Sequence, residues 1–544
     1  MIIPTYFLSL LSVLFYSAPI KTRTDFLILN ARIYTLSANN TIVEAMAIDK
    51  GKIVFVGSNA DAESAYLPDH KINLSGTTIF PGFIDAHCHF YGYGEQLNRV
   101  NLTGTKSWTE VINAITGFPI TDKTAWIQGR GWDQNDWDIK DFPTNELLNN
   151  AFPLQPVFIK RIDGHAAIAN DAALKIAGFS TSTKIYGGEL KIKNGRLTGV
   201  LIDNAMDSLE KFIPLADKKN IEENLLAAQQ KCFAVGLTTV SDAGLDKNVI
   251  DIIDSLQQSG LLKMRVYAML ADNEINRNYY FKHGPYKTER LSVRAFKFYI
   301  DGALGSRGAL MKKSYTDQSN YSGLLLKPID YFNRKFAECE ANGFQICAHC
   351  IGDSANKLTL DLYGNLLGGK NIKRWRIEHA QVVSPADMKL FAAYNIIPSI
   401  QPCFATSDMY WSKDRLGDAR MTGAYSWKTL LQNAGIIACG SDFPIEDINP
   451  LSGFFAAITR MDQKLFPSGG FMPEQKLTRL EALKGMTAWA AYANFMEEEV
   501  GSLTIGKKAD FVVLDKDIMN IPETETFKAQ VLMTFVNGEM VYKK

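Results

Sequence analysis

Four histidines and one aspartate form a set of side chains that can bind a metal ion. His87 and His89 stand two residues apart in PGFIDAHCHF. The other three occur in FQICAHCIGD (His349), RWRIEHAQ (His379) and IIACGSDFP (Asp442). Each motif follows a short apolar run, so each candidate ligand is expected where a buried strand ends. Carboxyl ends of parallel strands are where (β/α)8 barrels carry their chemistry. The sequence therefore predicts a hydrolytic metal centre.

The pair His87 and His89 is a weak signal when taken alone. Side chains alternate along a strand, so both imidazoles point to one face and can share a divalent ion. Ordinary polar residues at a strand end are the alternative, but that alternative leaves the three other strand ends unexplained. Mixed imidazole and carboxylate ligation favours zinc, with iron, manganese or nickel as alternatives, and one or two ions per chain.

Lys297 lies in the run AFKFYIDG, in register with Tyr299 and Asp301, and is expected to face the barrel interior. A bare buried ammonium is costly unless it is paired or neutral. An ion pair with Asp301 is one interpretation. The other is a neutral amine that has taken up CO2 to become a carbamate, which could bridge two metal ions.

A mechanism follows from this ligand set. His87, His89 and Asp442 are expected to hold one ion, His349 and His379 a second, with modified Lys297 between them. A metal-activated hydroxide is then expected to attack a substrate carbonyl. Asp442 would take the proton and return it to the leaving nitrogen.

Other candidates lie in two Gly-containing pieces, GRGWDQ and KRIDGHAAIAN. His165 is a candidate catalytic residue that would hydrogen-bond the carbonyl oxygen or the substrate, and a structural histidine is the alternative. Four residues are expected to line a substrate pocket, with a scaffold role as the alternative: Arg130, Trp132, Asp133 and Arg161. The glycines of DGALGSRGA have no Walker lysine beside them and indicate a plain loop.

These side chains need a large scaffold. Eight buried-strand patterns alternate with helix-length amphipathic segments, which is the count that closes a (β/α)8 barrel over about residues 81–496. The strand patterns cover residues 78–87, 236–244, 263–270, 295–302, 344–350, 374–380, 396–402 and 436–442. The interval of about residues 100–220 is too long for one crossover, so we expect an inserted subdomain over the barrel mouth.

The two ends of the chain have a different pattern. Residues 23–80 and 497–544 contain short strand-like runs with hairpin signals at Asp49-Lys50-Gly51-Lys52 and Asn537-Gly538. Neither end has enough strands for a stable sheet alone, so one small composite β-sandwich is expected from both. Residues 1–22 contain an apolar stretch typical of a signal peptide, which favours export to the periplasm or the extracellular space. An uncleaved anchor at the membrane, or a cytoplasmic protein, is the alternative.

Composition excludes some partners. The chain has 544 residues, with 58 Lys and Arg against 58 Asp and Glu. This balance gives no electrostatic footprint for nucleic acid, so a small-molecule substrate is expected. The seven cysteines are scattered through apolar runs and are interpreted as buried thiols rather than disulfides. The oligomeric state is open, and a homodimer is one alternative.

The combined motifs resemble the amidohydrolase superfamily, and more narrowly its branch with N-substituted formamide deformylase. The resemblance rests on PGFIDAHCH, KFYIDGALGSRGA, HCIGDSAN, RIEHAQ, GSDFPIEDINP and GSLTIGKKADFVVLD, and it covers nearly the whole chain after about residue 25. It implies a (β/α)8 barrel with a composite β-sandwich, and metal-dependent hydrolysis of carbon–nitrogen bonds other than peptide bonds. It also supports the carbamate on Lys297.

Three functional hypotheses remain at this point. The leading one is cleavage of an amide or formamide bond in a small molecule. Deamination or hydrolysis of an ester or phosphoester is the second, because the same centre can activate water against any of these. A non-catalytic scaffold is the third, and the presence of every expected ligand disfavours it.

Overall fold

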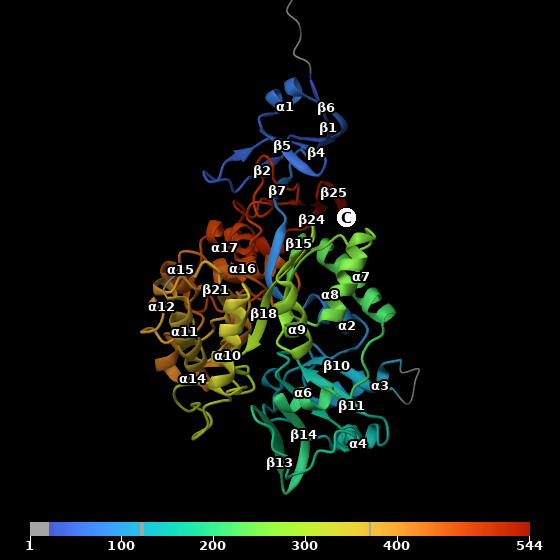
Figure 1. The fold of residues 1–544 in the computed structure, drawn as a ribbon, viewed down its shortest axis with the longest axis vertical. Helices are drawn as coiled ribbons and strands as arrows, with labels where there is room; N and C mark the ends of the chain where they lie inside the picture. Colours follow the sequence, from blue (N-terminus) through green and yellow to red (C-terminus); the bar gives the residue numbers. More distant parts are fainter. Residues whose placement is uncertain (1–20, 120–124, 369–370) are drawn as a thin grey trace, which may run out of the picture.

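The computed structural model describes residues 21–119, 125–368 and 371–544. Along its long axis lie β-sheets from the chain ends, then a barrel, then an inserted subdomain (Figure 1). The predicted leader lies outside the described residues except for Lys21 and Thr22, and Thr22 already begins strand β1 (Thr22–Leu29). No helix in the described ranges is both long enough and apolar enough to cross a membrane.

The predicted (β/α)8 barrel is confirmed. Its parallel strands pair in the order β22-β21-β20-β19-β18-β16-β15-β8 and form a nearly closed ring. The strands are β8 (Phe83–Cys88), β15 (Leu237–Leu245), β16 (Arg265–Ala271), β18 (Leu291–Tyr299), β19 (Gln345–Cys350), β20 (Arg376–His379), β21 (Ile397–Ile400) and β22 (Ala438–Cys439). Between β8 and the end of β22, the Ser441 hydroxyl donates to Asp85 Oδ2 at 2.6 Å. This contact links the first and last strands.

Amphipathic helices such as α8 (Lys247–Gln258) pack one buried face against the barrel. In α8 the buried apolar residues Val249, Ile250, Ile253 and Leu256 follow the helical period. Helix α7 (Lys218–Ala234) begins at Asp217, whose side chain accepts a hydrogen bond from the Asn220 amide. Further barrel helices are α2 (Phe90–Leu97), α9 (Glu274–His283), α10 (Ile329–Ala341), α11 (Asp353–Leu367), α12 (Lys389–Ala393), α15 (Trp427–Ala434), α16 (Pro450–Thr459), α17 (Arg479–Gly485) and α18 (Ala488–Ala493).

One predicted strand, residues 78–87, is two strands. Its first half, β7 (Thr78–Pro81), pairs antiparallel with β23 (Phe511–Leu514), and its second half is barrel strand β8. Gly82 separates them, and a Cβ atom there would lie 2.3 Å from the Thr238 hydroxyl. The prediction of a single strand was wrong because hydrophobicity alone does not reveal this close approach.

The chain ends form two sheets that share a buried apolar cluster. A four-stranded sheet has the order β5-β4-β1-β6, and a six-stranded sheet has the order β25-β24-β23-β7-β2-β3. The strands not yet bounded are β2 (Arg32–Tyr34), β3 (Ile42–Val43), β4 (Ala45–Asp49), β5 (Lys52–Gly57), β6 (Tyr66–Asn73), β24 (Val531–Val536) and β25 (Glu539–Lys543). Strands from both ends of the chain therefore share one sheet.

The inserted subdomain is a six-stranded mixed sheet of order β13-β14-β12-β11-β10-β9. Its strands are β9 (Val100–Asn101), β10 (Ile127–Trp132), β11 (Val157–Arg161), β12 (Ala166–Ala169), β13 (Gly188–Lys193) and β14 (Arg196–Asp203), and its helices include α3 (Trp108–Gly117), α4 (Glu146–Ala151), α5 (Asp171–Ile176) and α6 (Asn204–Glu210). It lies below the carboxyl ends of the barrel strands in Figure 1. All seven cysteines are buried and free, as predicted.

Candidate metal centre

A cavity of about 1880 Å³ lies between the carboxyl ends of the barrel strands and the inserted subdomain. The barrel side contributes His89, Lys297, His349, His379 and Asp442 to its wall. The candidate ligands therefore reach one cavity from five different strands, as the sequence predicted for a barrel mouth.

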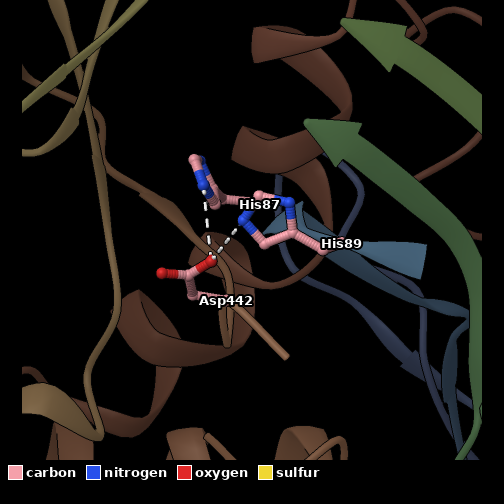
Figure 2. Close-up of side chains that lie close together, drawn as sticks. All are labelled: His87, His89 and Asp442. Carbon is pink, nitrogen blue, oxygen red and sulfur yellow. Dashed lines mark ion pairs between the residues drawn. The ribbon is translucent and has the colours of Figure 1, made fainter. Parts of the chain in front are cut away.

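Three of the predicted ligands form a tight group (Figure 2). Asp442 Oδ1 lies 3.2 Å from His89 Nε2 and 3.5 Å from His87 Nε2. The ligand atoms of all three residues lie within 4.8 Å of one another. Although it is buried, Asp442 Oδ1 accepts no hydrogen bond of regular geometry in the described chain. An ion between these atoms would satisfy a carboxylate oxygen that protein donors leave unsatisfied.

Hydrogen bonds fix which nitrogen of each imidazole is free. His89 Nδ1 donates to the Ala243 carbonyl at 3.0 Å, and His87 Nδ1 lies 2.5 Å from Glu378 Oε2. His379 Nδ1 lies 2.7 Å from Gln401 Oε1. Acceptors at Nδ1 leave Nε2 with its lone pair, which is the arrangement found around protein-bound metals.

The electrostatics of the group also suit a cation. Burial lowers the pKa of His89 to about 4 and lowers the pKa of His87, so both rings are neutral at neutral pH. Burial raises the pKa of Asp442, and a positive charge beside it, on a protonated His87 or His89, lowers that pKa, so the carboxylate favours a cation between these residues. Two neutral nitrogens and one carboxylate oxygen are a donor set that fits a divalent metal such as zinc.

His349 and His379 lie beside this group. The ring centroids of His379 and His87 are 4.9 Å apart, and those of His379 and His349 are 4.5 Å apart. His349 Nε2 is buried and has no hydrogen-bond partner among the described residues. His379 has φ 73°, a left-handed conformation that non-glycine residues rarely adopt. Asp442 has the same left-handed backbone conformation, with φ 63°. Backbone strain of this kind is common at functional sites.

Lys297 lies in the centre of the cluster. Its side chain is buried, and Nζ is 3.0 Å from His87 Nε2. Burial lowers the pKa of its ammonium group. The alternative ion pair with Asp301 is not observed, because the Asp301 carboxylate accepts backbone hydrogen bonds from Leu310, Ile351 and Gly352.

His165 also lines the cavity, with its ring centroid 4.8 Å from that of His349. Its Nδ1 lies 2.7 Å from Oδ1 of Asp203, a buried carboxylate that the sequence analysis did not single out. A Cβ atom on Gly302 or Gly308 would lie 2.3 or 2.5 Å from Asp203 Oδ2. These glycines of the predicted plain loop thus make room for the partner of His165.

Three of the four predicted substrate-pocket residues line the cavity: Arg130, Asp133 and Arg161. Arg161 is almost wholly buried and paired with Asp133 at 2.8 Å and Asp163 at 2.5 Å. Trp132 does not line the cavity. It is fully buried in the subdomain core and donates through Nε1 to the Ile159 carbonyl.

A bulge explains the misplacement of Trp132. The pairing of β10 with β11 shifts register between Arg130 and Trp132, where Gly131 has φ 119°. In a regular strand, Arg130 and Trp132 would share a face, but the extra residue turns them to opposite faces. The prediction that Trp132 lines the pocket was therefore wrong.

Sequence reasoning also missed the residues that hold the imidazoles. One carboxylate oxygen of Glu378 contacts His87 Nδ1. The other oxygen accepts a hydrogen bond from the Arg376 guanidinium at 2.5 Å. Arg376 holds the pKa of Glu378 well below its usual value, although burial acts in the opposite direction. The signal was present in RWRIEHAQ, where two charges alternate with apolar residues inside a buried strand. Gln401 gave no such signal.

Comparisons with known proteins identify the family of the chain. The profile of the amidohydrolase family matches residues 71–542. The protein YtcJ of Bacillus subtilis (strain 168) is 31% identical over 94% of this chain and 98% of its own length. N-substituted formamide deformylase of Arthrobacter pascens is 24% identical over 96% and 98%. An uncharacterized metal-dependent hydrolase from Pyrococcus horikoshii OT3 has a similar structure, with TM-score 0.76, 26% identity, and coverage of 92% of this chain and 99% of that one. With a family match across most of its length and a candidate His-His-Asp metal site, the chain belongs to the amidohydrolase family, whose members are metal-dependent.

Proposed function

We propose that this protein is a metal-dependent hydrolase that cleaves a non-peptide carbon–nitrogen bond of the amide or formamide type in a small molecule. The observation that carries the proposal is the convergence of His87, His89 and Asp442 on one point at the wall of the cavity, which His89 and Asp442 line. The similarity to a formamide deformylase supports the type of bond.

The ligands are assigned to two positions. His87, His89 and Asp442 would hold one ion, with zinc favoured by the donor set. His349 and His379 would hold a second. Burial lowers the pKa of Lys297 and so increases the share of neutral amine, which would add to CO2 and lose a proton to give a carbamate beside the two positions.

A divalent ion bound there would lower the pKa of a coordinated water and polarise the substrate carbonyl. Side chains of the protein would carry out the proton transfers and orient the substrate. The Asp442 carboxylate accepts the proton of the attacking water and delivers it to the leaving nitrogen. Against the effect of burial, the Asp203 carboxylate at Nδ1 raises the pKa of His165, and in the protonated ring Nε2 carries the hydrogen that would donate to the substrate carbonyl. Asp203 is a positioning residue because it acts through His165.

Metal analysis of the purified protein, combined with native mass spectrometry, tests the ligand assignment. We expect two ions per chain and an added mass of one CO2, which the substitution Lys297→Met removes. One ion without the adduct would contradict the carbamate and favour a mononuclear centre.

Activity is tested with N-formyl and N-acyl amines by following release of formate or the free amine. Asp442→Asn should abolish turnover. The control variant Asp462→Asn changes a half-buried aspartate that does not line the cavity and should leave turnover unchanged. Metal-loaded protein that hydrolyses none of these amides, but does hydrolyse esters or deaminates, would overturn the proposed bond type.

For the cellular location we keep the expectation of export, with a cytoplasmic protein as the alternative. N-terminal sequencing of the protein purified from its native host tests it, because a removed leader would shift the first residue to near position 20.

A further inference from the structure

Three of the six described arginines and lysines that line the cavity already have a carboxylate partner. Arg99 pairs with Glu95 at 3.0 Å, and Lys160 pairs with Glu210 at 2.5 Å. Arg161 is held between two aspartates. Lys297 belongs to the metal centre, and Lys327 is exposed to solvent. Among the described residues that line the cavity, Arg130 is the half-buried arginine with no carboxylate at ion-pair distance.

The Arg130 guanidinium is fixed along one edge. Nε and Nη2 donate to the Ile162 carbonyl oxygen at 3.2 and 2.9 Å. This bifurcated contact leaves Nη1 and the second N–H of Nη2 as a free edge. A guanidinium edge of two parallel N–H groups matches the two oxygens of a carboxylate. Because the protein already holds the side chain, a ligand loses little entropy in using it.

Arg130 shares the cavity with the reacting centre. Burial lowers the pKa of its guanidinium, and Asp442 is the carboxylate that acts most strongly in the opposite direction, followed by Asp163 and Glu210. Each of these three acids has a closer partner: Asp442 has the histidines, Asp163 has Arg161, and Glu210 has Lys160. Within the described part of the chain, no carboxylate therefore competes at contact distance for the free edge of Arg130.

We propose that Arg130 binds a carboxylate group of the substrate, so that the preferred substrates are N-acyl or N-formyl compounds that also carry a carboxylate. This inference rests on the proposed function for the nature of the cleaved bond. A carboxylate fits better than a phosphate, because Asp133, Asp163 and Asp207 also line the cavity and would repel a dianion more strongly.

Apolar side chains of the cavity lining suit an apolar substituent. Phe404 stacks on the candidate ligand His379 with ring centroids 5.9 Å apart, and Trp411 and Ile351 also line the cavity. N-formylphenylalanine has the formamide, the carboxylate and the apolar group that these surfaces would accept. Its carboxamide analogue, N-formylphenylalaninamide, differs only in lacking the charge.

The experiment measures both compounds on zinc-loaded full-length protein, by calorimetric binding at low temperature and by formate release. We expect the wild type to prefer the carboxylate by about 10- to 100-fold, the range of a bidentate charge-assisted contact. Arg130→Gln should remove this preference through weaker binding of the carboxylate, with little change for the amide. Arg130→Lys should restore part of it. The matched control Arg99→Gln, at a cavity arginine already paired with Glu95, should keep the preference.

The two proposals fail in different ways. If formate is released but the preference persists in Arg130→Gln, the carboxylate binds elsewhere, for example on the metal, and the role of Arg130 is overturned. Equal binding of both compounds to the wild type overturns it as well. If binding depends on Arg130 but no amide is cleaved, the carboxylate site stands and the proposed reaction fails.

Discussion

The metal centre depends on the hydrogen bonds that fix each imidazole. Glu378 illustrates this, because one of its oxygens orients His87 and the other meets Arg376. A carboxylate behind a ligating histidine fixes the ring and raises the basicity of the free nitrogen. Glu378 is therefore as much a part of the centre as the ligand it holds.

We predict that Glu378→Gln weakens metal binding by about 10- to 100-fold, because the imidazole loses its anionic partner. Competition with a chelator measures the affinity, and thermal unfolding checks the fold. Glu499→Gln, at a surface ion pair with Lys287, is the control and should bind metal as the wild type does. An unchanged affinity in a folded Glu378→Gln protein would contradict the orienting role.

His89 gives a prediction for pH dependence. Its folded pKa of about 4 lies below the unfolded value of about 6.5, so between these values the unfolded state binds the extra proton. The stability that neutral His89 contributes is therefore present above about pH 6.5 and is lost as the pH falls towards 4. Without metal, the free energy of unfolding should fall less in His89→Asn than in the wild type over this pH range. The difference between the two losses should be at most about 3 kcal/mol.

Denaturant unfolding of both proteins in the presence of a chelator at pH 7 and pH 4 measures this difference. Asparagine keeps a polar group at the start of α2, where His89 precedes Phe90. An equal loss in the free energy of unfolding between pH 7 and pH 4 in both proteins would show that His89 is not held neutral.

At the scale of elements, Gly82 joins the end sheets to the barrel. Gly82→Ala should destabilise the protein by about 1–3 kcal/mol, because the new methyl group meets Thr238. Gly453→Ala is the control, since a Cβ atom there meets nothing within 4 Å inside helix α16, and it should be neutral or stabilising. Thermal unfolding compares the stabilities of the two variants, and equal unfolding midpoints would refute the steric argument.

The elements also show what sequence could and could not predict. The eight barrel strands were predictable because parallel strands are buried on both faces and appear as short apolar runs. Candidate ligands followed from their place after those runs. Trp132 was misplaced because the bulge at Gly131 reverses the alternation. Asp203 was missed because the partner of His165 is 38 residues away along the chain, and only the folded subdomain brings the two together.

At the scale of the whole molecule, a buried ion pair connects the barrel to the end sheets. Arg265 on β16 contacts Asp510 beside β23 at 3.0 Å, and both side chains are almost fully buried. Arg265 also donates to Asn537 at 2.7 Å. The two parts of the molecule are therefore held together by charge as well as by apolar contact.

We predict that Asp510→Asn lowers stability by about 3–5 kcal/mol, because it leaves a buried cation without its carboxylate. Glu539→Gln is the matched control at the exposed pair with Lys263 and should cost about 1 kcal/mol or less. Calorimetric unfolding compares them. If both variants lose the same small amount, the buried pair does not couple the barrel to the sheets.

The pairing of β7 with β23 has a consequence for synthesis on the ribosome. Thr78 meets Leu514, so the two partners are separated by 514 − 78 = 436 positions along the chain. Strand β7 leads through Gly82 directly into β8, which carries His87. In a nascent chain β7 can pair with β2 early, but its antiparallel partner β23 emerges only near the end of synthesis. The sheet beside the first candidate ligands is therefore completed last, after every candidate ligand has been synthesised.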